Sequence, residues 1–257
     1  MSIKLIAVDM DGTFLSDQKT YNRDRFMAQY QQMKRQGIRF VVASGNQYYQ
    51  LISFFPEIAH EIAFVAENGG WVVSEGEDIF NGELTKADFQ AVVEHLLTRA
   101  DVEIIACGKN SAYTLKRYDD ALKAVAAMYY HRLEFVDNFN NINDVFFKFG
   151  LNITDERIPE VQAALHDAIG DIMVPVHTGY GSIDLIIPGV HKANGLRREI
   201  PRRIEQPGRR AGYYRQRIKQ RAAVQRLADA SLCLITESLS GVAALSDCLQ
   251  IPRPLIF

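Results

Sequence analysis

The chain has 257 residues, 47% of them hydrophobic and 23% charged, and its net charge is −2; this composition is typical of a globular protein with a sizeable core and excludes a disordered or fibrous chain. Its cysteines are too few and too scattered for a disulfide framework or a zinc site: Cys107, Cys233 and Cys248. No segment approaches the roughly 20 apolar residues that span a bilayer, and no signal peptide is apparent, so we expect a reducing cytoplasmic location and no membrane partner.

The first predicted element is an apolar run, residues 3–8, that is followed at once by two acids, Asp9 and Asp11. A short unbroken apolar run predicts a strand buried on both faces, as in a parallel sheet covered by helices. Gly12 then permits a sharp turn. Ligand sites in open α/β folds lie at the carboxyl edge of the sheet, so both acids are candidate site residues, although Asp and Gly are also common in ordinary turns.

The next segments alternate between helix and strand. The predicted elements are a helix over 22–36, a strand over 38–43, a short helix over 47–55, a strand over 62–66 and a hairpin from residue 71. This order predicts an α/β fold, a doubly wound parallel sheet. Right-handed crossovers would bring Asp9, Ser44 and Glu67 to one rim of that sheet.

The order of predicted helices and strands changes near residue 82. Helices are predicted over 85–99, 119–129 and 155–169, and strands over 102–107, 112–115, 145–149, 172–176 and 183–187. We interpret this segment, 82–185, as an α+β domain inserted into a core formed by 1–81 and 186–257. Lys192 follows the return to the core and could reach back over the sheet edge, but by residue type alone a solvated surface lysine is the simpler interpretation.

Four short motifs together resemble the haloacid dehalogenase superfamily of phosphohydrolases. They are Asp9-Met10-Asp11-Gly12-Thr13, Ser44-Gly45-Asn46, Glu67-Asn68-Gly69 and the Lys192 segment His191-Lys192-Ala193-Asn194-Gly195. The inserted segment resembles the large cap of the Cof-like sugar-phosphatase branch. The resemblance covers residues 1 to about 196. It implies a Rossmann-like core with a cap, and a phosphatase whose partner is a small-molecule phosphate ester.

The resemblance also implies roles for individual residues. Asp9 would attack phosphorus and form an aspartyl-phosphate, and Asp11 would act as general acid and then general base. Mg²⁺ is the implied cofactor, with Asp9 and Asp11 as its ligands, the second through its backbone carbonyl. The cap would close over the site and choose the leaving group. The implied substrate-binding residues are Ser44, Gly45, Asn46, Lys192 and Asn194.

The family pattern breaks after about residue 196. A fourth acidic motif is expected one helix and one strand beyond Lys192, but residues 210–221 contain no carboxylate, and neither Asp229 nor Asp247 follows a strand in a Gly-Asp turn. The net charge changes at the same place, from −9 over residues 1–196 to +9 over 197–226. We therefore treat 197–257 as an atypical part of the core. Our hypothesis is a changed reading frame just after Gly195 or Leu196, and the competing explanation is a genuine divergent tail; sequencing of the coding DNA distinguishes the two.

Three functions remain open from the sequence. The first is a Mg²⁺-dependent phosphomonoester hydrolase acting on sugar phosphates, impaired if the fourth acidic motif is missing. The second is a catalytically inactive phosphate-ester binding protein or frameshifted remnant. The third is a phosphoacceptor domain of the response-regulator kind, which the inserted domain and the combination of Asp11 with Ser44 disfavour. The basic segment lacks a recognisable nucleic-acid fold, so we expect no nucleic-acid partner. The sequence indicates neither the sugar phosphate nor the oligomeric state.

Overall fold

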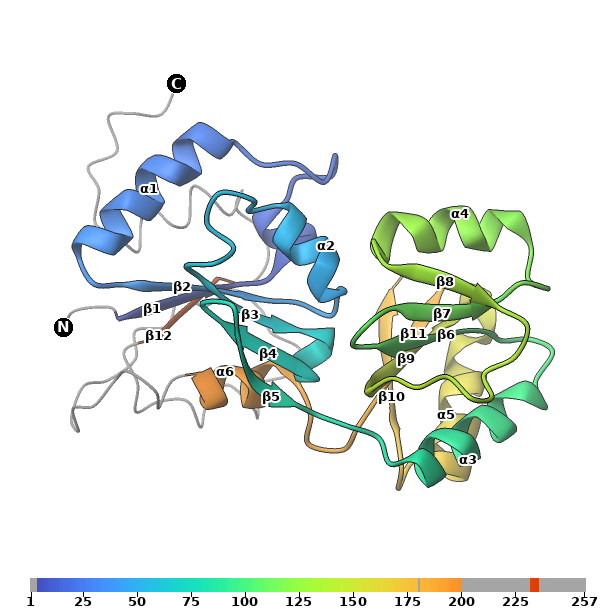
Figure 1. Cartoon of the computed structure of the whole chain (residues 1–257). Helices are drawn as coiled ribbons and strands as arrows, with labels where there is room; N and C mark the ends of the chain where they lie inside the picture. Colours follow the sequence, from blue (N-terminus) through green and yellow to red (C-terminus); the bar gives the residue numbers. More distant parts are fainter. Residues whose placement is uncertain (1–3, 180, 200–231, 236–257) are drawn as a thin grey trace.

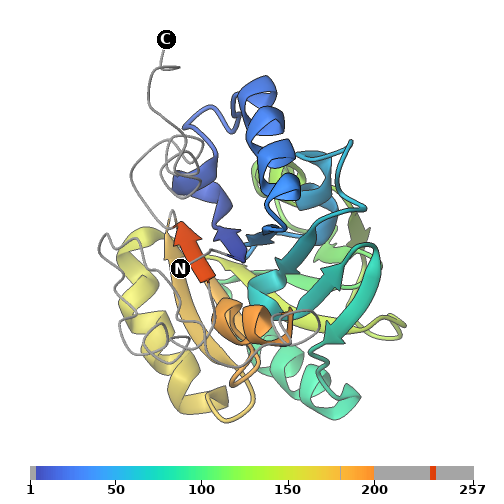
Figure 2. The same cartoon turned by 90° about the vertical axis from the view of Figure 1, so that its left-hand side faces the viewer.

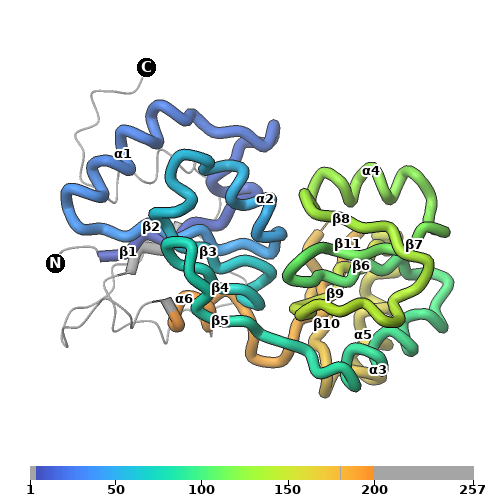
Figure 3. Tube along the Cα trace, viewed as in Figure 1, coloured from blue at the N-terminus to red at the C-terminus, as the bar shows by residue number. Residues whose placement is uncertain are grey.

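The computed structural model describes residues 4–179, 181–199 and 232–235. These residues form two lobes, each built on one six-stranded sheet (Figures 1 and 3). The chain leaves the first lobe after its fifth strand, builds the second lobe, and returns to the first at a short helix. The fold is therefore α/β with an inserted α+β unit.

The first sheet has the strand order β12-β1-β2-β3-β4-β5. Four neighbouring strands run parallel, and the last two extend the sheet as an antiparallel hairpin. The strands are β1 (Leu5–Val8), β2 (Arg39–Ala43), β3 (Ala63–Ala66), β4 (Trp71–Ser74), β5 (Glu77–Asn81) and β12 (Leu232–Ile235).

Both faces of the first sheet are buried, as the apolar run before Asp9 predicts. Ile6 and Val8 belong to a core cluster that includes residues of α1 (Arg23–Arg35) and α2 (Tyr48–Ser53). The alternate residues Leu5 and Ala7 belong to a cluster on the other face, with Leu196 of α6 (Lys192–Glu199). Helices thus lie on opposite sides of the sheet (Figure 2), because successive side chains of a strand point to opposite faces.

The second sheet has the order β10-β11-β9-β6-β7-β8. Helices α3 and α5 pack on one face in a single large apolar cluster, and α4 packs against the other face through Ala126. The strands are β6 (Glu103–Gly108), β7 (Ala112–Leu115), β8 (Leu133–Val136), β9 (Phe146–Asn152), β10 (Val174–Gly179) and β11 (Ser182–Ile186). The helices are α3 (Lys86–Leu97), α4 (Asp120–Tyr129) and α5 (Ile158–Ile169).

Every helix and strand predicted up to residue 187 has a counterpart within a few residues of its predicted bounds. Two strands were not predicted. Strand β8 spans only four residues, and Glu134 interrupts its apolar residues, so no unbroken apolar run marks it in the sequence. Strand β12 pairs in parallel with the free side of β1, Leu5 opposite Leu232. The window 197–226, where no strand was expected, lies almost wholly outside the described residues.

Two glycines allow α6 to dock closely on the first sheet. Gly69 has φ +95°, and a Cβ there would lie 2.5 Å from the carbonyl oxygen of His191. A Cβ on Gly195 would lie 2.4 Å from a methyl group of Val65. Only glycine avoids both contacts, so these positions let the first turn of α6, with Lys192, approach the rim of the sheet.

We expect Gly69→Ala to be more destabilising than Gly76→Ala. Both glycines have positive φ, +95° and +82°, but nothing lies within 4 Å of a Cβ at Gly76. Gly76→Ala should therefore cost about 1–2 kcal/mol of backbone strain alone. Gly69→Ala should cost a further 1–3 kcal/mol or so because it also displaces the His191 backbone. Urea unfolding of both variants measures the difference, and equal losses would contradict this account of α6.

Candidate functional site

Asp9 and Asp11 lie at the carboxyl end of β1, where the chain leaves the sheet in a wide turn. The Phe14 amide donates to the Asp9 carbonyl at 3.1 Å, and the Leu15 amide donates to the Met10 carbonyl at 2.9 Å. Met10, between the acids, is fully buried, whereas the side chains of Asp9 and Asp11 are 33% and 36% exposed. The two carboxylates therefore remain accessible while the residue between them anchors the turn.

Lys192 joins the site from a distant part of the sequence. Its Nζ lies 3.0 Å from both carboxylate oxygens of Asp9, across a sequence separation of 183 residues. Lys192 is the first residue of α6, the helix that packs against β3 and the Gly69 turn. The surface-lysine interpretation is therefore wrong: this ammonium pairs with the carboxylate predicted to attack phosphorus.

Asp11 contacts the loop that follows β2 and a second lysine. The Asn46 amide donates to Asp11 Oδ2 at 2.7 Å, and Lys19 Nζ lies 2.5 Å from Oδ1. The backbone amide of Asn46 also donates to Ser44 Oγ at 3.2 Å. Asp11, Ser44 and Asn46 thus meet at one rim. Sequence reasoning missed Lys19, whose loop position eight residues after Asp11 carries no recognisable pattern.

Gly45 and Asn194 have contacts of a different kind. The Gly45 carbonyl accepts a hydrogen bond from Lys148 Nζ at 2.7 Å, and a Cβ on Gly45 would lie 2.9 Å from the side-chain oxygen of Asn68. The Asn194 amide donates to the Gly189 carbonyl at 2.7 Å and its oxygen accepts from Arg197. These bonds organise the entry to α6, and substrate binding by Asn194 stays a prediction.

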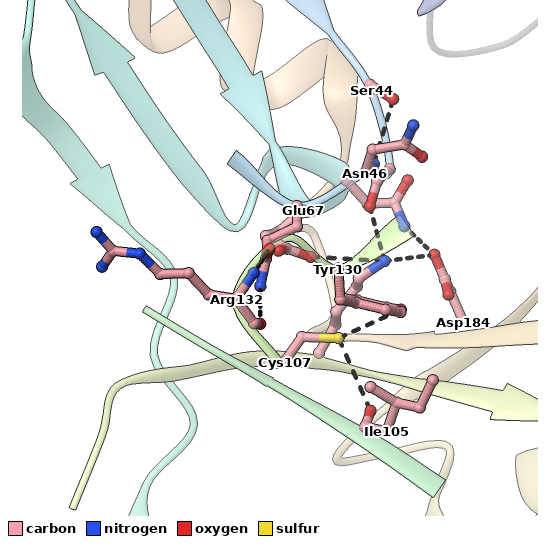
Figure 4. Close-up of polar contacts among 12 residues, drawn as sticks. Ser44, Asn46, Glu67, Ile105, Cys107, Tyr130, Arg132 and Asp184 are labelled. Atoms are coloured by element: carbon pink, nitrogen blue, oxygen red, sulfur yellow. Dashed lines mark hydrogen bonds and ion pairs between the residues drawn. The ribbon is translucent and has the colours of Figure 1, made fainter. Parts of the chain in front are cut away.

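A buried cluster of charges links the two lobes just behind this rim (Figure 4). Lys148 of β9 lies 3.0 Å from Asp184 of β11 and 3.5 Å from Glu67, which follows β3. The Asn68 amide donates to the same Asp184 oxygen at 2.5 Å. Sequence reasoning placed Glu67 on the open rim with Asp9 and Ser44. Glu67 does follow the neighbouring strand, but its side chain is only 1% exposed and faces the second lobe.

Burial shifts the protonation of this cluster. Desolvation raises the pKa of Glu67 to about 7; the nearby Lys148 charge opposes the shift and Asp184 adds to it. Burial also opposes the charge on Lys148, but Asp184 and Glu67 outweigh it and raise the pKa of the lysine. One ammonium with one ionised carboxylate is neutral, whereas two ionised carboxylates leave a net negative charge in a buried site. Glu67 is therefore the group that retains its proton up to about pH 7.

The two acidic residues at this rim, Asp9 and Asp11, offer the oxygen ligands that a hard cation prefers. Mg²⁺ prefers oxygen ligands and is commonly held by one or two carboxylates together with waters and substrate phosphate. Asp9 and Asp11 supply such oxygens, including the Asp11 backbone carbonyl. Within residues 4–179, 181–199 and 232–235 there is no group of three or more His, Cys, Asp or Glu side chains that could hold a metal ion. The candidate ligand set in this part of the chain is therefore small and centred on Asp9.

A separate depression on the first lobe lies away from the predicted site residues. This depression of about 320 Å³ lies at the opposite, amino-terminal end of β2, lined by residues such as Lys34, Arg39 and Glu61. Lys34 and Glu61 pair with each other at 2.8 Å, and none of the predicted site residues lies there.

Of the helices that the structure describes, none combines the length and apolarity needed to cross a membrane.

Comparisons with known proteins agree on one family. A model of haloacid dehalogenase-like hydrolases matches residues 6–202. The chain is 85% identical, over 197 residues that make up 77% of it and 73% of the relative, to the protein of Escherichia coli (strain K12) named 5-amino-6-(5-phospho-D-ribitylamino)uracil phosphatase YbjI. A solved structure from Streptococcus mutans UA159 has a TM-score of 0.79 at 27% identity, covering 95% of this chain and 91% of that one. The HAD subclass IIB sugar phosphatase BT4131 shares the fold, with a TM-score of 0.68 at 15% identity and coverage of 95% and 92%.

The protonation of Glu67 predicts a pH-dependent stability difference. Its folded-state pKa, about 7, lies above the ordinary value of 4.5. Its stabilising contribution is therefore complete below about pH 4.5 and is lost as the pH rises through 7. Glu67→Gln cannot ionise, so it should gain stability relative to the unsubstituted protein between pH 5 and pH 8, by up to about 3 kcal/mol.

Urea unfolding of both proteins at pH 5 and pH 8 measures this gain. A stability difference that is the same at the two pH values, or that moves against the variant at pH 8, would contradict the assigned proton.

Proposed function

Because the chain belongs to the haloacid dehalogenase-like hydrolase family, we propose that it is a Mg²⁺-dependent phosphomonoester hydrolase that cleaves sugar phosphates through an aspartyl-phosphate. One observation carries the proposal: Asp9 and Asp11 meet Lys192 and the Ser44–Asn46 loop at a single rim of the first sheet. These groups come from three separate parts of the sequence and together supply a nucleophile, an acid–base group and phosphate-binding donors.

The first step would transfer the phosphoryl group to Asp9. An Asp9 oxygen forms a bond to phosphorus while the bond from phosphorus to the leaving oxygen breaks, and Asp11 gives that oxygen a proton. Lys192, now paired with both Asp9 oxygens, would place its positive charge beside the phosphoryl oxygens. Ser44 would donate a hydrogen bond to one of them, stabilising charge on the transferred group.

The second step would release phosphate. Asp11, left as a carboxylate, takes a proton from water, the water oxygen attacks phosphorus, and the Asp9–phosphorus bond breaks. Asn46 holds Asp11 by a hydrogen bond at 2.7 Å, which supports an orienting role in both steps. Bound Mg²⁺, held by the Asp9 carboxylate and the Asp11 backbone carbonyl, would supply charge neutralisation at the phosphate.

The substrate would be a phosphorylated sugar or sugar alcohol. The relative from Escherichia coli is named for a phosphoribitylamino-uracil, and its 85% identity over 197 residues favours a substrate of that class for this chain. The second lobe lies against the rim and would act as the cap that encloses the leaving group and excludes water. Among its contacts there, the backbone of Arg132 bonds to the side chain of Gln47 at 2.8 and 2.9 Å.

A second candidate, a catalytically inactive phosphate-ester binding protein, is favoured by a specific observation. The described part of the chain contains no cluster of three metal-ligating side chains, and a fourth acidic motif was not found in the sequence beyond Lys192. The family match ends at residue 202 of 257, which supports a change of reading frame near Gly195 or Leu196. If the second candidate is correct, phosphate esters bind without turnover.

Phosphate release distinguishes the two candidates. The unsubstituted protein should hydrolyse p-nitrophenyl phosphate and a panel of sugar phosphates, including a phosphoribitylamino-uracil, when Mg²⁺ is added and not when EDTA is present. Asp9→Asn should reduce turnover to the level without protein, because an amide cannot attack phosphorus. If the unsubstituted protein is no faster than Asp9→Asn while both bind the esters, the hydrolase proposal fails and the binding protein is favoured.

Ser44 offers a graded test of the same site. Ser44→Ala should lower kcat by about 10²- to 10³-fold, the usual cost of one donor to the charged transition state, and should cost about 1 kcal/mol of stability because the Asn46 amide loses its acceptor. Ser53→Ala, which removes a hydroxyl bonded to a backbone carbonyl at the end of α2, serves as the matched control and should leave kcat unchanged. Equal kcat values for the two variants would exclude Ser44 from the phosphoryl site.

A further inference from the structure

Lys148 is a buried cation whose contacts cross from the second lobe to the first. It lies in β9 with 4% of its side chain exposed, on a strand otherwise rich in phenylalanine. Its ammonium contacts the Gly45 carbonyl at 2.7 Å, Asp184 at 3.0 Å and Glu67 at 3.5 Å. An ammonium has three hydrogens to donate; the Gly45 carbonyl and Asp184 accept hydrogen bonds from this one, and Glu67 lies within ion-pair distance.

The surroundings of Lys148 therefore differ from those of a lysine that binds substrate, because its ammonium is buried and already bonded to protein groups. Withdrawing an ammonium from water costs several kcal/mol unless partners compensate for it. Here the Asp184 carboxylate, the carboxyl group of Glu67 and the Gly45 carbonyl do so, and two of the three come from the first lobe. The contact with the Gly45 carbonyl is the one that reaches the catalytic rim.

The Gly45 carbonyl belongs to the peptide group that precedes Asn46. The N–H of the same peptide group belongs to Asn46 and donates to Ser44 Oγ at 3.2 Å. The side chain of Asn46 donates separately to Asp11 at 2.7 Å. Fixing the carbonyl fixes the plane of the peptide, and hence the direction of the Asn46 backbone N–H; the side chain of Asn46 extends from the Cα atom at the end of the same plane. The loop residues predicted to bind phosphate are thus oriented from the opposite lobe.

A neighbouring contact supports the same coupling. Asn68, on the turn after β3, donates to Asp184 at 2.5 Å, and its side-chain oxygen occupies the space beside Gly45. Asp184 therefore holds Lys148 and Asn68 at once (Figure 4 shows Asp184 in this network). Separation of the lobes would remove the ammonium from the loop.

We propose that Lys148 is a positioning residue: docking of the second lobe delivers its ammonium to the Gly45 carbonyl and thereby sets the Ser44–Asn46 loop for phosphoryl transfer. The proposal rests on the proposed hydrolase function and deepens it, because closure and ordering of the phosphate-binding loop become one event. A lysine that only balanced buried charge would not affect that loop.

Three variants, with Lys148→Arg as a conservative fourth, separate these roles. Lys148→Met keeps much of the side-chain length and removes the charge. Lys148→Met with Asp184→Asn also removes the carboxylate that the lysine balances, so the buried site is not left with that unpaired charge. Lys116→Met is the control, since it removes a lysine of the second lobe whose pair with Asp137 is exposed; it should leave activity unchanged.

We expect Lys148→Met and the double variant both to lower kcat by about 10- to 100-fold, the range expected for a small misplacement of a reacting group. KM for p-nitrophenyl phosphate should change by less than about threefold, and Lys148→Arg should restore part of kcat. A double variant with kcat close to that of the unsubstituted protein would overturn the proposal and leave charge balance as the role of Lys148.

The backbone amide resonances of Gly45 and Asn46 in the full-length protein give a readout that needs no turnover. Both should shift in the double variant and stay in place in Lys116→Met. If the unsubstituted protein lacks activity, the proposed function fails, yet these resonances still decide whether Lys148 orders the loop. Unshifted resonances would overturn the positioning role even in an active enzyme.

Discussion

The parallel pairing of β1 with β2, and of β2 with β3, is the constraint on which the site depends. Because these strands run in the same direction and are in register, the residues that follow them meet at one edge. Asp9 follows β1, and Ser44 follows β2. Lys192 reaches the same edge because α6 packs against β3 and the Gly69 turn. An antiparallel arrangement of the same strands would send every second loop to the opposite edge.

Much of this site could be predicted from the sequence. A short apolar run that ends in two acids predicts both the buried strand and its functional edge, and Ser44 follows a second run of the same kind. Lys192 could be placed only by the resemblance, since the position of one lysine after a strand carries little information. The short apolar pattern of β8, interrupted by Glu134, and the distant pairing of β12 with β1 explain why those strands were not predicted.

The buried cluster was missed although its signals are visible in the sequence. Lys148 stands in the run Phe146-Phe147-Lys148-Phe149, and Asp184 stands in Ile183-Asp184-Leu185. A charged residue inside an apolar strand predicts a buried charge that needs a partner. Which charges pair depends on the strand order, and β11 neighbours β9 through a register that sets Asp184 opposite Gly150. That register is a tertiary property, so the pair could not be deduced from either strand alone.

The two lysines of the site differ in the property that decides what each can do. Lys192 is 35% exposed and pairs with a carboxylate that is equally accessible. An incoming phosphate can therefore share this cation with Asp9 at little desolvation cost. Lys148 is 4% exposed, so exchange of its partners would leave the buried carboxylate of Asp184 unpaired. Lys192, which is accessible, is therefore suited to pairing with the phosphoryl charge that changes during the reaction. Lys148, which is buried, is suited to a contact that must persist throughout the reaction.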